Sequence, residues 1–274
     1  MYPILFRFGP LTIYSYGFFL AIAYLAGTFF FWREGRKRGY KEEKLIDFSV
    51  VALLSAIIGG RLFYILINYD SFAGNLWRFF FFWEGGFAYY GSFVFVLLTG
   101  AYLIRKWKWD FFQVADIAVL AVLLATFFGK IGSFLAGNDY GAVTKFPIAV
   151  VFPLLEGKRH PVQIYEAVFA LVLFIILFKV YQDRLTKLAQ LRSGAVFFYY
   201  LIFWSLGRIV LEQLRGDSTY FGPFRLASLL ALLVAIFSTL GLYYYQFRNF
   251  KSDFNTISKH IFGLNLRFKR PFRR

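Results

Sequence analysis

Long apolar blocks separated by short polar segments dominate the hydrophobic pattern of the chain. A helix needs about 20 mostly apolar residues to cross the hydrocarbon core of a bilayer. Each block that approaches this length predicts a transmembrane helix. The predicted spans are Leu11–Trp32, Leu45–Ile67, Phe87–Ile104, Val114–Leu135, Gln163–Tyr181, Ala195–Leu214 and Phe224–Tyr245. The pattern therefore predicts an all-α fold, a polytopic membrane helical bundle with about seven transmembrane helices.

Basic residues gather in alternate loops between these spans. The loops after the first, third and fifth spans, together with the C-terminal segment, hold 20 Lys and Arg residues. The N-terminal segment and the remaining loops, which would lie on the opposite side of the membrane, hold 7. Cytoplasmic loops carry the excess of Lys and Arg in membrane proteins. We therefore expect the N-terminus outside and the C-terminus in the cytoplasm. The long outer loop from Ala136 to Pro161 is expected to be a re-entrant or interfacial segment.

Two parts of the chain are expected, a membrane-embedded domain at 1–246 and a basic cytoplasmic tail at 247–274. The tail interleaves cations with Phe and Leu, which suits the anionic inner leaflet. A disordered end that only fixes topology is an equal alternative. The first ten residues lack the basic region and cleavage site of a signal peptide, so the first span is expected to be retained.

Composition argues against several classes of partner and cofactor. The chain is 59% hydrophobic with a net charge of +16, but its cations lie in short loops and not on one soluble face, so we expect no nucleic-acid partner. The absence of cysteine excludes disulfides and thiolate ligands. A zinc site built on His160 and His260 alone is not expected. We expect no metal and no cofactor.

Three cations inside predicted spans each follow a glycine: Arg61, Lys130 and Arg208. A charge at mid-bilayer is costly and usually faces a partner or a cavity. Small residues let helices approach closely, so we expect each glycine to pack its cation inside the bundle. Lys179, near a cytoplasmic end, is expected to snorkel, and Asp116 to cap the fourth span.

Arg208 and Glu212 are spaced i and i+4 on one helical face, so they are predicted to pair. Arg215 lies one turn nearer the outer surface, and Glu166 is a further acid inside a span. Buried cations with few compensating anions suggest an anionic ligand. A phospholipid headgroup is the obvious candidate at that depth.

Six segments in order resemble bacterial prolipoprotein diacylglyceryl transferases. They are the N-terminal MYPILFRFGPLTIYSYGFFLAIAYLAG, IIGGRLFY at 57–64, EGGFAYYGS at 84–92, GKIGSFLAGNDYG at 129–141, HPVQIYEA at 160–167 and RIVLEQLRGD at 208–217. The resemblance extends over residues 1 to about 245. It implies transfer of the diacylglyceryl group of phosphatidylglycerol to the lipobox cysteine thiol in the signal peptide of a prolipoprotein. It also implies a multi-pass protein of the bacterial inner (cytoplasmic) membrane, surrounded by membrane lipids.

The family's usual signature is Gly-Arg-x-Gly-Asn-Phe-x-Asn-x-Glu-x-x-Gly, and this chain departs from it. Lysine replaces the phosphate-contacting arginine and keeps the charge without the bidentate fork. Ser133 replaces the first asparagine, Asn138 replaces the acidic residue, and Asp139 follows. Tyr90 stands where some members carry a histidine. The positions that match directly are Tyr16, Arg61, Arg208, Glu212 and Arg215.

The resemblance implies the following roles. Lys130 contacts the lipid phosphate with help from Arg208 and Arg61, while Glu212 orients Arg208 or accepts a proton. Tyr90 supplies a hydroxyl in the histidine position. Substrate contacts are expected at Tyr16, Ser133, Asn138, Asp139, Arg215, His160 and Gln163, although the segment holding the last two is equally suited to anchoring the fifth span.

Two other classes of function remain open from the residues. The altered signature fits a divergent paralogue that binds lipid or lipoprotein without transfer. A transporter or channel with a cationic pore is the other. The chain shows no internal repeat of the kind that marks many transporters, and the ordered motifs also disfavour that class.

Overall fold

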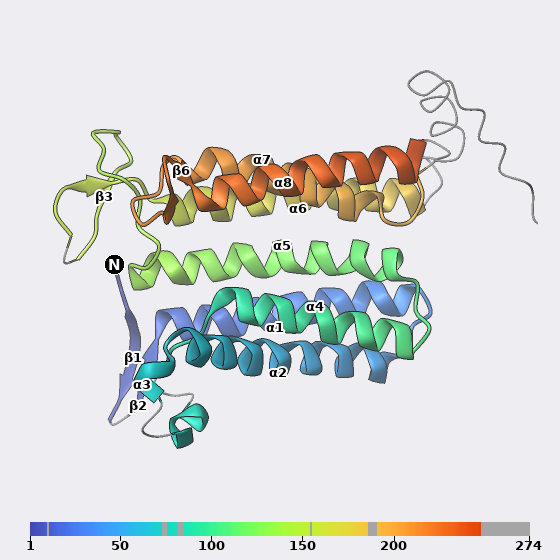
Figure 1. Cartoon of the computed structure of the whole chain (residues 1–274), viewed down its shortest axis with the longest axis horizontal. Coiled ribbons are helices and arrows are strands. Elements are labelled where there is room, and N and C mark those ends of the chain that lie inside the picture. Colours follow the sequence, from blue (N-terminus) through green and yellow to red (C-terminus); the bar gives the residue numbers. More distant parts are fainter. Residues whose placement is uncertain (10, 73–75, 82–84, 154, 186–190, 248–274) are drawn as a thin grey trace, which may run out of the picture. The chain divides into compact units, whose positions relative to one another are not determined.

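The computed structural model describes the whole chain except residues 10, 73–75, 82–84, 154, 186–190 and 248–274. It divides into two compact units, each described here by itself (Figure 1). The N-terminal unit is Tyr2–Ala136, and the C-terminal unit is Gly137–Arg274 together with Met1. The predicted basic tail at 247–274 lies outside the described residues except for Phe247.

Each of the seven predicted spans corresponds to a long helix in the described part of the chain. The helices are α1 (Ser15–Lys37), α2 (Glu42–Ile67), α4 (Tyr89–Lys106), α5 (Phe111–Ala136), α6 (Val162–Leu185), α7 (Ala195–Glu212) and α8 (Leu226–Leu242). All of these helices except α4 are long and apolar enough to cross a membrane. For α8 this holds for the stretch Leu226–Gln246, which includes most of the following π-helical turn. The protein is a predominantly helical, multi-pass membrane protein.

The start of the first predicted span is wrong, because Leu11–Tyr14 forms a strand. This strand, β2, pairs antiparallel with β1 (Ile4–Phe8). The helix begins at Ser15, whose amide donates to the Pro3 carbonyl at 2.9 Å and whose hydroxyl donates to the Tyr2 carbonyl. A short run that contains apolar, β-branched and aromatic residues suits a strand as well as a helix. Hydropathy alone does not separate the two.

Other helix ends also differ from the predicted spans by a few residues. α7 stops at Glu212, two residues early, and α8 starts at Leu226 because Phe224–Arg225 forms β6, which pairs with β5 (Tyr220–Phe221). The expectation that Asp116 caps the fourth span is also wrong. The cap is Asp110, whose carboxylate accepts the Gln113 amide at 2.7 Å.

In the N-terminal unit α1 packs against α5, and α2 packs against α4. The short α3 (Tyr69–Phe72) and the 3₁₀ turn η1 (Leu76–Phe80) follow α2. α2 and α4 cross where Gly59 meets Gly91, since a Cβ on Gly59 would lie 2.7 Å from the Gly91 carbonyl oxygen. Gly60, which directly precedes Arg61, leaves no room for a Cβ beside the Ser92 hydroxyl, so the glycine pair before Arg61 acts as predicted.

The expectation that a preceding glycine packs its cation inside the bundle is wrong for Gly129 and Lys130. Within the described part of the chain, nothing lies within 4 Å of a Cβ built on Gly129. The close approach of α5 to α1 is instead at Gly132, where a Cβ would lie 2.6 Å from the Cβ of Phe19. In the segment Gly129–Gly132, Gly132 packs against the neighbouring helix and Gly129 does not. The sequence alone does not show which of the two glycines makes the contact.

Gly59→Val is expected to lower the melting temperature of the detergent-solubilised protein. The added side chain must push against a backbone carbonyl, and such overpacking typically costs about 1–3 kcal/mol. Gly129→Ala is the matched control, because it meets open space and gains helix propensity of up to about 1 kcal/mol. Equal melting temperatures for Gly59→Val and wild type would contradict the close α2–α4 crossing.

The C-terminal unit holds α6, α7 and α8, which lie side by side (Figure 1). α6 and α7 approach closely at Gly207, whose position leaves no room for a Cβ beside the Phe169 ring. The predicted re-entrant or interfacial loop contains the hairpin of β3 (Val150–Val151) and β4 (Lys158–Arg159), and the described residues of 137–161 include no helix. The chain after α8 continues as a π-helical turn, η3 (Tyr243–Phe247).

Candidate functional site

Arg208 lies near the end of α7 and is clamped by two buried carboxylates. Its Nη2 lies 2.9 Å from Oε2 of Glu212, one turn along the same helix, so the predicted i and i+4 pair is confirmed. Its Nη1 donates to Oε1 of Glu166 on α6 at 2.6 Å. The Arg208 side chain itself is 29% exposed. The two carboxylates therefore fix a guanidinium that remains open on one side.

Sequence reasoning placed Glu166 inside a span but not in the site. In the structure this carboxylate also lies 3.4 Å from Nη1 of Arg215, so it bridges both arginines. The available signal was an acid in an otherwise apolar helix, which usually marks a partner or a function. A spacing rule within one helix could not identify a partner on another.

Arg215, just beyond α7, contacts three carboxylates. Besides Glu166, its Nη2 lies 3.3 Å from Asp139, and it makes two hydrogen bonds of 2.9 and 2.8 Å to Asp217. Burial acts to lower the pKa of Arg215. The hydrogen bonds that Arg215 donates to Asp217, together with the charges of Glu166, Asp217 and Asp139, outweigh that effect, so the pKa of Arg215 lies above its ordinary value. This guanidinium stays charged.

These contacts correct the expectation that the buried cations have few compensating anions. Among the described residues, Arg208 and Arg215 are contacted by four carboxylates. The acids come from α6, from the loop after α5 and from α7 and its end, so local sequence spacing reveals only part of the set. The arginines are held in position before any ligand arrives.

Two glycines bring the Asp139 loop against the end of α7. Gly141 pairs with Arg215 in an isolated bridge, and the Ala142 amide donates to the Leu214 carbonyl at 2.8 Å. A Cβ on Gly141 would lie 2.8 Å from the His160 Cβ, and one on Gly216 would lie 2.6 Å from the Gly141 carbonyl oxygen. The last part of the 129–141 segment thus meets the 160–167 and 208–217 segments.

Arg225 on β6 organises the C-terminal end of α7 and was not among the predicted site residues. Its Nη1 donates to the Glu212 carbonyl, to the Arg215 carbonyl at 3.1 Å and to the Ser218 hydroxyl at 2.8 Å. Cations near a helix C-terminus satisfy its unpaired carbonyls. The sequence places this residue more than ten positions beyond the helix end, so only the hairpin reveals its role.

His160, Gln163 and Asn138 have partners that suit the anchoring alternative. His160 Nδ1 lies 3.3 Å from the Tyr165 hydroxyl, and its amide donates to the Ala142 carbonyl at 3.1 Å. The buried Gln163 donates from Nε2 to the backbone carbonyl of Asn138, whose side chain is exposed. These bonds tie the loop to the start of α6, and substrate contact at these residues stays a prediction.

Arg61 has a different set of partners from the one predicted. It is buried on α2, and all three guanidinium nitrogens donate to backbone carbonyls. Their acceptors are Arg78, Phe79, Phe81, Gly85 and Gly86. This cation therefore holds the described parts of the segment 78–86 that leads into α4. Nothing in these contacts supports the predicted phosphate role, which stays a prediction.

The other predicted site residues of the N-terminal unit lie near helix ends. Tyr16 and Tyr90 are exposed in the first turns of α1 and α4. Lys130 and Ser133 lie three residues apart on α5, so they share a face, with Ser133 buried and Lys130 half-buried. Their roles stay predictions. Within the described residues no cluster of three or more His, Asp or Glu side chains could hold a metal ion.

Comparisons with known proteins identify the family of this chain. The family model described as prolipoprotein diacylglyceryl transferase matches residues 3–244. A phosphatidylglycerol–prolipoprotein diacylglyceryl transferase of Clostridium tetani is 33% identical over 253 residues, covering 86% of this chain and 96% of its own length. A protein of the same name from Listeria welshimeri is 30% identical, and the match covers 89% of this chain and 89% of that protein. Another from Trichormus variabilis is 28% identical, and the match covers 88% of each chain. The chain belongs to the prolipoprotein diacylglyceryl transferase family.

Proposed function

We propose that this protein transfers the diacylglyceryl group of phosphatidylglycerol to the lipobox cysteine thiol of a prolipoprotein. The setting is the bacterial inner membrane, with the site toward the outer leaflet. Family membership and the names of the relatives support the reaction class and the two substrates. The membrane helices support access to a lipid substrate.

The reaction is a displacement at the glyceryl carbon that carries the phosphate ester. A C–S bond forms to the cysteine sulfur as the C–O bond to phosphate breaks, and glycerol phosphate leaves with the electron pair. The thiol proton passes to a base. The step therefore needs positive charge where the leaving phosphate gains negative charge and an acceptor for the proton.

The clamped Arg208 is the observation that carries this proposal. A guanidinium presents paired donors that match phosphate geometry. Two carboxylates, at 2.6 and 2.9 Å, hold its terminal nitrogens and leave part of the side chain exposed. Such preorganisation lets a cation stabilise developing charge without reorganising during the reaction. We assign Arg208 to the leaving phosphate.

The remaining roles follow from this assignment. Glu212 orients Arg208, and Glu166 does the same from α6 while linking Arg215 to the pair. The family resemblance, and not a contact with Arg208, supports Lys130 as a second cation for the phosphate and Tyr90 as a hydroxyl that takes part in the reaction. Signal peptides carrying a lipobox cysteine are the acceptor substrate.

The test uses purified protein in vesicles of phosphatidylglycerol and phosphatidylcholine, with a synthetic lipobox peptide. We expect equimolar formation of thioether-linked diacylglyceryl peptide and free glycerol phosphate, measured by mass spectrometry and by a radiolabel in the headgroup. A peptide with serine in place of the cysteine is the control and should give neither product. Lipid binding without product, while a typical transferase works in parallel, would overturn the enzyme and favour a non-catalytic paralogue.

A further inference from the structure

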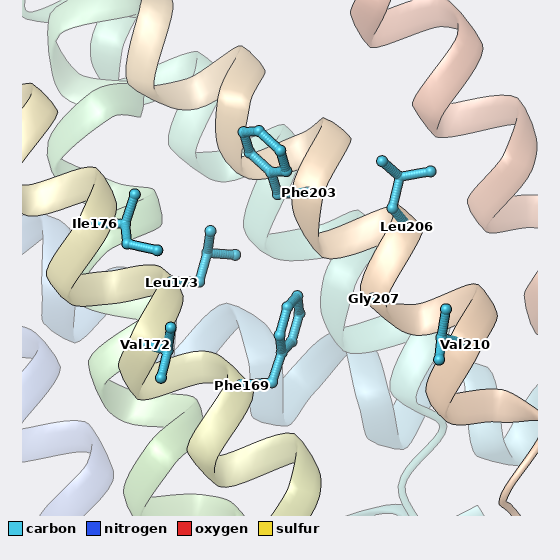
Figure 2. Close-up of a pocket in the computed structure, with 8 residues that line it drawn as sticks. All are labelled: Phe169, Val172, Leu173, Ile176, Phe203, Leu206, Gly207 and Val210. Carbon is cyan, nitrogen blue, oxygen red and sulfur yellow. The ribbon is translucent and has the colours of Figure 1, made fainter.

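An apolar groove runs along the seam between α6 and α7 in the C-terminal unit. Its volume is 330 Å³. Figure 2 shows side chains of both helices around this space, with Phe169 and Leu173 on α6 facing Phe203 on α7. All the lining residues are apolar: Phe169, Val172, Leu173, Ile176, Phe203, Leu206, Gly207 and Val210.

At the centre of the groove the two helices are in close contact, with Phe169 of α6 against Gly207 of α7. The Phe169 ring fills the place where any side chain at position 207 would lie, and it stacks on Trp204 with ring centroids 5.6 Å apart. Other lining side chains, among them Val172, Leu206 and Val210, are exposed. The helices therefore touch along one line while the outer rims of the groove stay open.

The groove begins at the level of the charged network. Glu166 precedes Phe169 by three residues on the same face of α6, and Arg208 directly follows Gly207 on α7. From Glu166 to Ile176 the α6 axis advances about 15 Å at 1.5 Å per residue. One end of the groove thus lies beside a partly exposed guanidinium, and the other lies deep in the membrane span.

We propose that this groove binds one acyl chain of an anionic diacylglycerol phospholipid whose phosphate lies at Arg208. The inference rests on the proposed function, because it places the lipid substrate of that same site. The guanidinium complements an anionic headgroup, and the apolar lining that starts beside it complements the attached chain. Both helices are long and apolar enough to cross the membrane, so the groove lies along membrane-spanning segments.

A signal peptide does not fit this groove. An extended peptide would bring backbone N–H and C=O groups against a lining without polar side chains, and unpaired polar groups are costly there. A helical peptide is about 10 Å across with its side chains and rises about 5.4 Å per turn, so a single turn occupies about 400 Å³. That exceeds the 330 Å³ of the groove. A flexible hydrocarbon chain has neither problem.

The first measurement is crosslinking, and it does not depend on transfer. Wild-type protein is placed in vesicles of phosphatidylcholine with phosphatidylglycerol carrying a photoactivatable group in one acyl chain, and labelled residues are mapped by mass spectrometry. We expect labels within 169–176 and 203–210, and excess unlabelled phosphatidylglycerol should reduce them by at least about tenfold. Labels spread evenly over other lipid-facing helices would overturn the groove even if the protein is an active transferase.

The second measurement fills the groove. Val172→Trp and Leu206→Trp are expected to lower kcat/KM for oleoyl-chain phosphatidylglycerol about tenfold and to leave the hexanoyl-chain lipid within about twofold of wild type. Ile175→Trp is the control, because Ile175 is also exposed on α6 but does not line the groove. Equal chain-length discrimination in all three variants would overturn the proposal. If wild type transfers nothing, the competed crosslinks alone decide it.

Discussion

Arg208→Ala should reduce diacylglyceryl transfer by at least about 100-fold, because it removes the cation proposed to stabilise the leaving phosphate. Loss of one preorganised donor to a developing oxyanion costs about 10²–10³ in rate. Arg208→Lys keeps the charge but cannot reach Glu166 and Glu212 with two fixed nitrogens, so we expect an intermediate rate. The measurement is kcat/KM for peptide lipidation in vesicles of defined phosphatidylglycerol content.

The alanine variant also leaves the buried Glu212 carboxylate without Arg208 and leaves Glu166 paired with Arg215. Breaking a buried ion pair destabilises a protein by about 3–5 kcal/mol. Stability and chemistry must therefore be separated. Adding Glu212→Gln to Arg208→Ala removes the uncompensated charge and should restore much of the melting temperature without restoring transfer. Recovery of transfer together with stability would show that Arg208 is only structural.

Lys130→Ala is expected to abolish measurable transfer, whereas Lys130→Arg retains or raises it. The family signature carries arginine at this position, and lysine keeps the charge while losing the bidentate fork for phosphate. Restoring the fork should strengthen the contact if position 130 faces the phosphate. Initial rates at limiting phosphatidylglycerol compare the three proteins directly.

Lys179→Ala provides the matched control for this pair. Lys179 is another lysine in a membrane-crossing helix, exposed near the cytoplasmic end of α6, so its loss should leave transfer unchanged. Transfer by Lys130→Ala at the wild-type rate would refute the phosphate role. A loss of transfer in both alanine variants would instead indicate a general need for positive charge in the helices.

Helix number was predictable because hydropathy reports burial in lipid, and each predicted span contains a helix. The helix starts were less predictable. Leu11–Tyr14 is apolar enough to extend the first span, yet it pairs with Ile4–Phe8 as a strand. Hydropathy measures the free energy of transfer from water and says little about which backbone hydrogen bonds a segment makes at the edge of a membrane.

The candidate site was predictable only along each helix. The i and i+4 spacing revealed the Arg208–Glu212 pair, because a helix places those residues on one face. Glu166 and Arg225 were missed, since each reaches the site from another element. Arg61 carried the same signal as Arg208, a glycine-flanked cation in a span, but its donors bind carbonyls of the described residues in 78–86.

The sequence by itself therefore determined that the chain crosses the membrane several times and which spans carry charge, because lipid excludes unpaired polar groups and the exceptions stand out. Only the tertiary structure decided what those charges do. Ion pairing depends on distances of 3–4 Å between side chains, and those distances are set by helix crossings such as Gly207 against Phe169. The same crossing lies in the apolar groove and next to the partly exposed Arg208, a relation that no spacing along the chain records.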